Sequence, residues 1–90
     1  MTEKTILTDA EYNVLNRIAS QTKMDCWFYL KTDSAGNDYV LDIENSDILT
    51  LREGISQLNE GIVWDLLSLT AEEIAVYNNL LNELGIKEVM

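Results

Sequence analysis

The sequence predicts a small α+β domain, in which an antiparallel hairpin packs against helices in the order α-β-β-α-(β)-α. Two observations carry this prediction. The pattern Leu-Thr-x-x-Glu occurs three times, beginning at residues 7, 49 and 69, and each copy is typical of a helix start. Two runs rich in strand-forming residues lie between the first two copies, on either side of Gly36. Such a succession favours helices packed on one face of an antiparallel sheet.

Each Leu-Thr-x-x-Glu pattern is interpreted as a capping box. The threonine hydroxyl accepts a hydrogen bond from the main-chain N–H three residues later, and the glutamate carboxylate accepts one from the threonine N–H. The three copies are unevenly spaced and the segments between them do not match. They therefore predict three independent helix starts rather than an internal repeat.

The predicted helices cover residues 9–22, 51–60 and 71–84. Apolar residues recur at helical spacing in all three: Ala10, Val14, Leu15 and Ile18; Leu51, Ile55 and Leu58; Ile74, Tyr77, Leu80, Leu81 and Leu84. Gly61 is expected to end the second helix, and Gly85 the third, with Ile86 folding back in a Schellman motif. Gly54, inside the second helix, costs about 1 kcal/mol relative to alanine, so this helix is expected to depend on packing.

Residues 25–31 and 39–44 are predicted to form the two strands of a hairpin. The connection 33–37 suits a type I turn followed by Gly36 in the left-handed conformation. This loop sets the register, with Lys31 opposite Tyr39, Tyr29 opposite Leu41 and Trp27 opposite Ile43. Because two strands alone are only marginally stable, residues 62–67 are interpreted either as a third strand or as an extended link that packs Trp64 and Leu67 inward.

The register divides the hairpin side chains between two faces, since side chains alternate along a strand. The larger apolar set is predicted to face the helices: Trp27, Tyr29, Tyr39, Leu41 and Ile43. The other set contains Phe28, Leu30, Val40, Asp38 and Asp42. On this second face, the three apolar side chains are either covered by the C-terminal segment or exposed to a partner.

The composition excludes several kinds of chemistry. The chain has 90 residues, expected to form one domain over 1–90, with no histidine and one cysteine. Without histidine there is no imidazole base, and Cys26 alone makes neither a Cys/His zinc site nor an internal disulfide. Residues 33–44 have the length of a calcium loop, but Ala35 and Asp38 occupy positions that need an oxygen ligand and a glycine. We expect no catalytic residue, no metal and no cofactor, and Cys26 is predicted to be a small buried apolar residue.

The charge and the N-terminus indicate where the protein acts and what it does not bind. Sixteen acidic residues against six basic ones give a net charge of −10, and the basic residues are scattered singly, whereas nucleic acid and anionic membranes need clustered ones. No apolar run approaches the ~20 residues of a membrane span, and the N-terminus lacks the layout of a signal peptide. These features predict a cytoplasmic protein that binds neither nucleic acid nor membrane.

Two functional hypotheses follow. The first is a non-enzymatic interaction or accessory module that binds a protein partner or a second copy of itself. The second is an inhibitor that mimics nucleic acid and blocks a basic groove, since spaced carboxylates can stand in for phosphates. The candidate partner surface combines the second hairpin face with the acidic residues near it: Phe28, Leu30, Asp33, Asp38, Val40, Asp42, Glu44 and Asp47.

Overall fold

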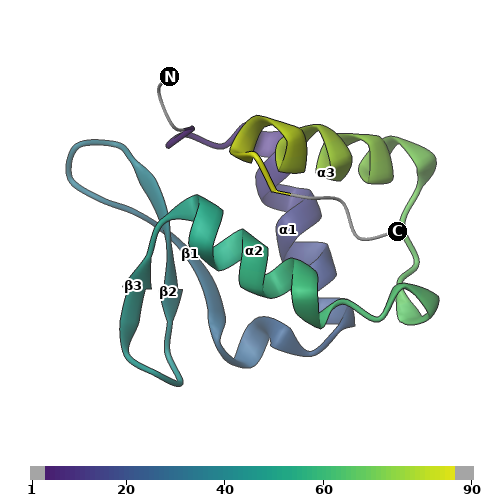
Figure 1. Cartoon of the computed structure of the whole chain (residues 1–90), viewed down its shortest axis with the longest axis horizontal. Coiled ribbons are helices and arrows are strands. Elements are labelled where there is room, and N and C mark those ends of the chain that lie inside the picture. Colours follow the sequence, from purple (N-terminus) through teal and green to yellow (C-terminus); the bar gives the residue numbers. More distant parts are fainter. Residues whose placement is uncertain (1–3, 87–90) are drawn as a thin grey trace.

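Three helices and a three-stranded antiparallel sheet make up the protein in a computed structural model that describes residues 4–86 (Figure 1). In chain order the elements are α1 (Asp9–Gln21), η1 (Met24–Cys26), β1 (Phe28–Thr32), β2 (Asp38–Asp42), β3 (Asp47–Leu49), α2 (Leu51–Gly61), η2 (Trp64–Leu66) and α3 (Ala71–Leu84). The strands are ordered β1-β2-β3. The predicted fold class is confirmed, with the order α-β-β-β-α-α in place of α-β-β-α-(β)-α.

All three predicted capping boxes are present. Thr8, Thr50 and Thr70 are the N-caps, and each hydroxyl accepts from the main-chain N–H of the glutamate three residues later. Each glutamate in turn accepts from the threonine N–H, at 2.9 Å for Thr8, 3.3 Å for Thr50 and 2.9 Å for Thr70. Because these bonds involve neighbouring residues alone, the sequence pattern was sufficient to predict them.

Removal of the Thr70 hydroxyl tests how much the N-cap of α3 contributes to the free energy of unfolding. Thr70→Ala is expected to lower the free energy of unfolding by about 0.5–2 kcal/mol, because the first turn of α3 loses its side-chain acceptor. Thr70→Ser keeps the hydroxyl and is the matched control. Urea unfolding followed by circular dichroism measures both, and equal stabilities for the two variants would contradict a role for the cap.

The two predicted helix ends differ in geometry. Gly85 is left-handed, with φ of 72°, and the Ile86 N–H donates to the Leu81 carbonyl at 2.9 Å, which is the expected Schellman bond. Gly61 is instead the last helical residue of α2, and the cap is Ile62 in an extended conformation. The helix therefore ends at Gly61, as predicted, although this glycine is not in the left-handed conformation. A Cβ at Gly61 would lie 2.9 Å from the Met24 sulfur, so close packing explains this glycine.

The hairpin register is as predicted. Tyr29 pairs with Leu41 and Lys31 with Tyr39, and the Ile43 N–H donates to the Trp27 carbonyl at 3.2 Å. Gly36 has φ of 88° in the connecting loop. The third strand, however, is β3 rather than 62–67, because the chain turns back directly after β2 and pairs Leu41 with Ile48.

The segment 62–67 contains the short η2 turn instead of a strand. Trp64 and Leu67 are partly buried and pack against the core. Of the two interpretations of this segment, the strand is wrong, and the inward packing of these two side chains is confirmed. The segment connects α2 to α3 and does not extend the sheet.

The sheet faces the helices with the opposite side from the one predicted. Phe28, Leu30 and Val40 are at most 7% exposed, whereas Tyr29 and Ile43 are 38% and 49% exposed. The cause lies in α2, which packs directly on β2: a Cβ at Gly54 would lie within 2.7 Å of three Val40 side-chain atoms. Gly54 thus lets the helix approach the smaller apolar set, which becomes the inner face.

The inner face and the helices enclose one apolar core. Its fully buried members come from all three helices and the sheet: Leu15, Ile18, Val40, Leu51, Ile55, Leu58, Tyr77, Leu80 and Leu81. The apolar residues predicted for the helix stripes are all buried, apart from Ala10, which is exposed, and Ile74, which is half-buried. One polar pair lies inside this core, where the Tyr77 hydroxyl donates to Asn59 Oδ1 at 2.7 Å.

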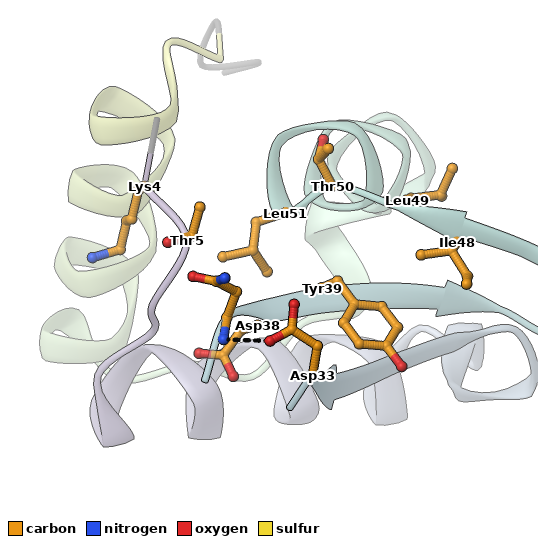
Figure 2. A pocket seen from close by; sticks show the side chains of 10 residues that line it. Lys4, Thr5, Asp33, Asp38, Tyr39, Ile48, Leu49, Thr50 and Leu51 are labelled. Carbon is orange, nitrogen blue, oxygen red and sulfur yellow. Dashed lines mark hydrogen bonds between the residues drawn. The ribbon is translucent and has the colours of Figure 1, made fainter. Parts of the chain in front are cut away.

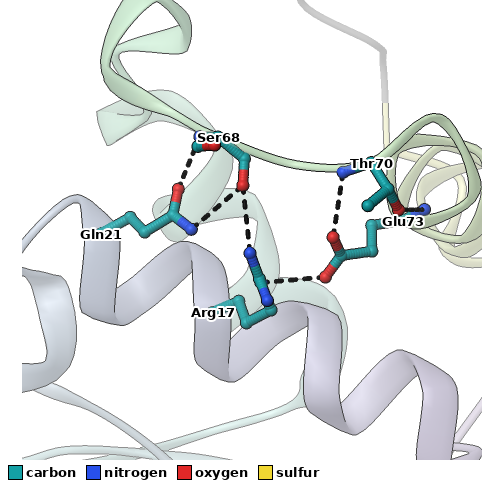
Figure 3. Close-up of polar contacts among 5 residues, drawn as sticks. All are labelled: Arg17, Gln21, Ser68, Thr70 and Glu73. Atoms are coloured by element: carbon teal, nitrogen blue, oxygen red, sulfur yellow. Dashed lines mark hydrogen bonds and ion pairs between the residues drawn. The ribbon is translucent and has the colours of Figure 1, made fainter.

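A polar clamp joins α1 to the segment before α3 (Figure 3). Arg17 donates to the Ser68 carbonyl at 3.1 Å and pairs with Glu73 at 2.9 Å. Gln21 both donates to and accepts from the Ser68 main chain, at 3.2 and 2.7 Å. The hydrogen bond from the Thr70 N–H, with the Arg17 charge in addition, lowers the pKa of Glu73 below its ordinary value.

Candidate interaction surface

The outer face of the sheet carries a row of apolar side chains. Tyr29, Leu41 and Ile48 stand directly opposite one another on β1, β2 and β3. Ile48 is 74% exposed, Tyr29 is 38% exposed, and Leu41 is half-buried. Ile43, 49% exposed, follows at the end of β2. Monomeric proteins seldom leave a contiguous apolar patch open to water, and such patches mark interaction sites.

The outer face is almost free of charge. The strand positions that point outward are Tyr29, Lys31, Tyr39, Leu41 and Ile48, and of these residues only Lys31 is charged at neutral pH. The chain as a whole has a net charge of −10, so the acidic residues lie elsewhere. Depletion of charge at the centre, with aromatic residues present, is typical of the core of a protein–protein interface.

Four residues of the predicted partner surface are buried. Phe28, Leu30, Val40 and Asp42 are 3%, 7%, 0% and 4% exposed. They belong to the inner face, so that face is covered by the helices rather than open to a partner. The prediction that placed them on a contact surface is corrected, because the helices cover the opposite side of the hairpin from the one expected.

The acidic residues of the predicted surface are mostly engaged within the chain. Asp33 Oδ1 accepts from the Ala35 and Asn37 N–H groups, both at 2.9 Å, and closes the hairpin loop. Asp38 accepts from the Leu7 N–H at 2.8 Å and from the Thr32 hydroxyl at 2.6 Å.

Buried Asp42 also has local partners, because it accepts from the side chain and the main chain of Asn45 in the turn before β3. Together with Asp33 and Asp38, it therefore has a structural role.

Glu44 and Asp47 are the exposed acids that remain from that list. Glu44 accepts from the Cys26 thiol at 3.4 Å. Cys26 is exposed rather than buried as predicted, because it ends the η1 turn at the surface. Local desolvation and the hydrogen bond to Glu44 raise the pKa of this thiol above its ordinary value. The thiol therefore stays protonated at neutral pH and is a poor nucleophile.

A pocket of about 250 Å³ adjoins the outer face (Figure 2). Tyr39 and Ile48 belong both to the outer face and to the pocket wall, and Thr5 and Leu51 line it from other segments. The volume is just below the ~300–1,000 Å³ usual for small-molecule sites. The pocket is large enough to receive one or two side chains of a docked protein.

The charged groups that line the pocket are already paired. Lys4 forms ion pairs with Glu83 at 2.9 Å and with Glu11 at 3.2 Å. Partial burial opposes the charge on Lys4, but the two carboxylates outweigh it and raise its pKa. Asp33 and Asp38 hold the hairpin loop and the N-terminal segment, as described above. These contacts stabilise the pocket wall and leave the apolar side chains to contact a ligand.

Within residues 4–86, no three histidine, cysteine, aspartate or glutamate side chains are grouped so that they could hold a metal ion. None of the helices in that part of the chain combines the length and apolar character needed to cross a membrane.

Ile48 is the central residue that the sequence analysis missed. It lies in a three-residue strand between the turn at 43–46 and the capping box of α2, which is too short for a period-2 pattern to be recognised. The available signal was its position: an isoleucine between Asp47 and the Leu-Thr-x-x-Glu helix start.

Comparison with family models, curated proteins and solved structures finds no match to the chain.

Proposed function

We propose that the protein is a non-enzymatic interaction module of the cytoplasm, which binds a protein partner through the outer face of its sheet. The observation that carries this proposal is the row of Tyr29, Leu41 and Ile48 on the outer face, with Ile48 at 74% exposure and Tyr29 at 38%. Burial of apolar area contributes about 25 cal/mol per Å². The adjoining pocket supports the proposal, since interface anchors often fill such hollows.

The nucleic-acid mimic receives less support. It needs a row of free carboxylates, whereas Asp33, Asp38 and Asp42 accept hydrogen bonds from their own chain. Glu44 and Asp47 are the two acids of the original set that would remain for a basic groove. The interaction module and the mimic make opposite predictions for the same pair of variants, so one experiment separates them.

The experiment compares binding to variants of the immobilised chain. Proteins retained from an extract of the cells that make the chain are identified, and the affinity of each is then measured individually. Ile48→Ser is expected to weaken the partner by about tenfold or more, because an exposed apolar anchor is lost. Leu66→Ser is the matched control, since Leu66 is 68% exposed on η2 and lies outside the sheet.

The double variant Glu44→Lys with Asp47→Lys tests the mimic. The interaction module predicts a small change in affinity and weak dependence on salt. A partner that is lost on this charge reversal, is released by salt and tolerates Ile48→Ser would contradict the proposal and support the mimic.

A further inference from the structure

The strand β1 is an open edge of the sheet. Main-chain groups alternate in direction along a strand, and on β1 the odd-numbered residues bond to β2. Both ends of the strand show this pattern. The main-chain N–H of Asp33 donates to the Asn37 carbonyl at 2.9 Å, and the Trp27 carbonyl accepts from the main-chain N–H of Ile43. The main-chain groups of Phe28, Leu30 and Thr32 therefore point away from the sheet. Within residues 4–86, β1 pairs with no strand besides β2.

This edge lacks most features that block strand pairing. Natural sheets protect their edges with prolines, bulges, charges or very short strands. β1 has five residues, contains no proline, and pairs with β2 without interruption of the register. Its single charged residue is Lys31. By contrast, the opposite edge strand β3 is three residues long and begins with Asp47.

We propose that β1 pairs antiparallel with β1 of a second copy of the chain, so that the two sheets join into one of six strands. One register pairs all five residues. Leu30 lies opposite Leu30 of the second copy, and Phe28 lies opposite Thr32. The outward main-chain groups of these residues then exchange hydrogen bonds across the two-fold axis, as in any antiparallel ladder.

The charges favour this register. On the outer face it places Lys31 opposite Tyr29 of the second copy, twice per dimer. A lysine beside an aromatic ring is a favourable pair, and no like charges face each other. Displacement by two residues in one direction would set Lys31 opposite Lys31, which is destabilising. The one charge on β1 therefore selects the full-length register rather than blocking the edge.

The expected dimer is reversible. Five residues span about 17 Å, and an edge of that length buries less surface than the ~800 Å² per partner of a standard stable interface. Each copy also has a net charge of −10, so the copies repel one another, and salt reduces this repulsion. Salt should strengthen self-association, whereas it weakens binding to an oppositely charged partner. Pairing would join the outer faces of the two copies into one face of twice the area. The use of that larger face to bind a partner rests on the proposed function.

Sedimentation velocity of the whole chain, at concentrations from ~10 μM to ~1 mM and at low and moderate salt, tests the pairing. The expected mass rises with concentration and with salt from 10.2 kDa toward twice that value. Tyr29→Lys is expected to weaken the dimer by about tenfold or more, because the introduced lysine faces Lys31 of the other copy. Tyr29→Lys combined with Lys31→Glu is expected to restore it.

The main-chain bonds are tested separately at Thr32. Its N–H points outward, so Thr32→Pro removes a main-chain donor to the second copy and no main-chain donor to β2. It also removes the hydroxyl that donates to Asp38. Thr32→Val also lacks the hydroxyl but keeps the N–H, so it is the matched control and should dimerise as the original chain does. Thermal melts at low concentration establish that each variant folds.

A mass of 10.2 kDa at all concentrations, or a dimer unaffected by Tyr29→Lys, would overturn the proposed pairing. If partner binding remains sensitive to Ile48→Ser in that case, the outer face keeps its proposed role. If dimers form as described while Ile48→Ser changes no partner's affinity, the edge pairing stands and the proposed function fails.

Discussion

Gly54→Ala is expected to destabilise the protein by about 1–3 kcal/mol, although alanine favours a helix by about 1 kcal/mol over glycine. The added Cβ would lie 2.3 Å from Val40 Cγ2 and 2.4 Å from Val40 Cβ. Val40 cannot turn aside easily, since the χ1 angle of its β-branched side chain is restricted and the residue is fully buried. The helix must therefore move away from the sheet.

A double-mutant cycle with Val40→Ala isolates this contact. In the Val40→Ala background the two close methyl groups are absent and the Cβ remains, so Gly54→Ala is expected to cost less than it does in the original chain. Denaturant unfolding of the four proteins gives the coupling energy. If Gly54→Ala costs the same in both backgrounds, the close approach of α2 to β2 is not the reason for this glycine.

Tyr77→Phe is expected to lower the free energy of unfolding by about 1–3 kcal/mol. The Tyr77 hydroxyl donates to Asn59 Oδ1 inside the core, and both residues are at most 3% exposed. Without the hydroxyl, Asn59 is left with a buried acceptor that has lost its partner, and this costs more than the bond itself contributed. Replacement of both residues, by Tyr77→Phe with Asn59→Leu, should recover part of the loss.

The pH dependence of stability gives a second readout for Tyr77. Burial raises its pKa above the ordinary value of 10.0, so as the pH rises the unfolded chain loses this proton before the folded protein does. Stability should therefore fall above about pH 10, by at most about 1.4 kcal/mol per pH unit from this group. The Tyr77→Phe variant has no hydroxyl to ionise and should lack this loss of stability. Identical slopes for the two proteins in that range would show that Tyr77 ionises equally in both states.

The helix starts and the hairpin register were predictable because they depend on neighbouring residues. Thr8, Thr50 and Thr70 each bond to a glutamate three residues away, and the loop around Gly36 fixes the pairing of β1 with β2. The choice of face is different, because pairing defines two sets of side chains without saying which set meets a helix. Gly54 determines which face is buried, because the absence of a side chain lets α2 pack against Val40. This contact joins residues distant in the sequence.

The candidate surface was harder to predict for the same reason. The acids at Asp33, Asp38 and Asp42 suggested a charged docking site, but each satisfies a hydrogen bond in a turn or a connection. Because the faces are exchanged, two of the apolar residues expected inside, Tyr29 and Ile43, are exposed. Position in the sheet, rather than residue type, determines that Tyr29 and Ile48 contact solvent.

Site-specific photocrosslinking tests the central claim, that the outer sheet face is the contact surface. A photoreactive amino acid is placed at position 48 on β3, and in a second protein at position 79 on the exposed side of α3. Both proteins are irradiated in the cells that make the chain. Covalent adducts with another protein, or with a second copy, are expected from position 48 and not from position 79. Adducts from position 79 alone would contradict the claim.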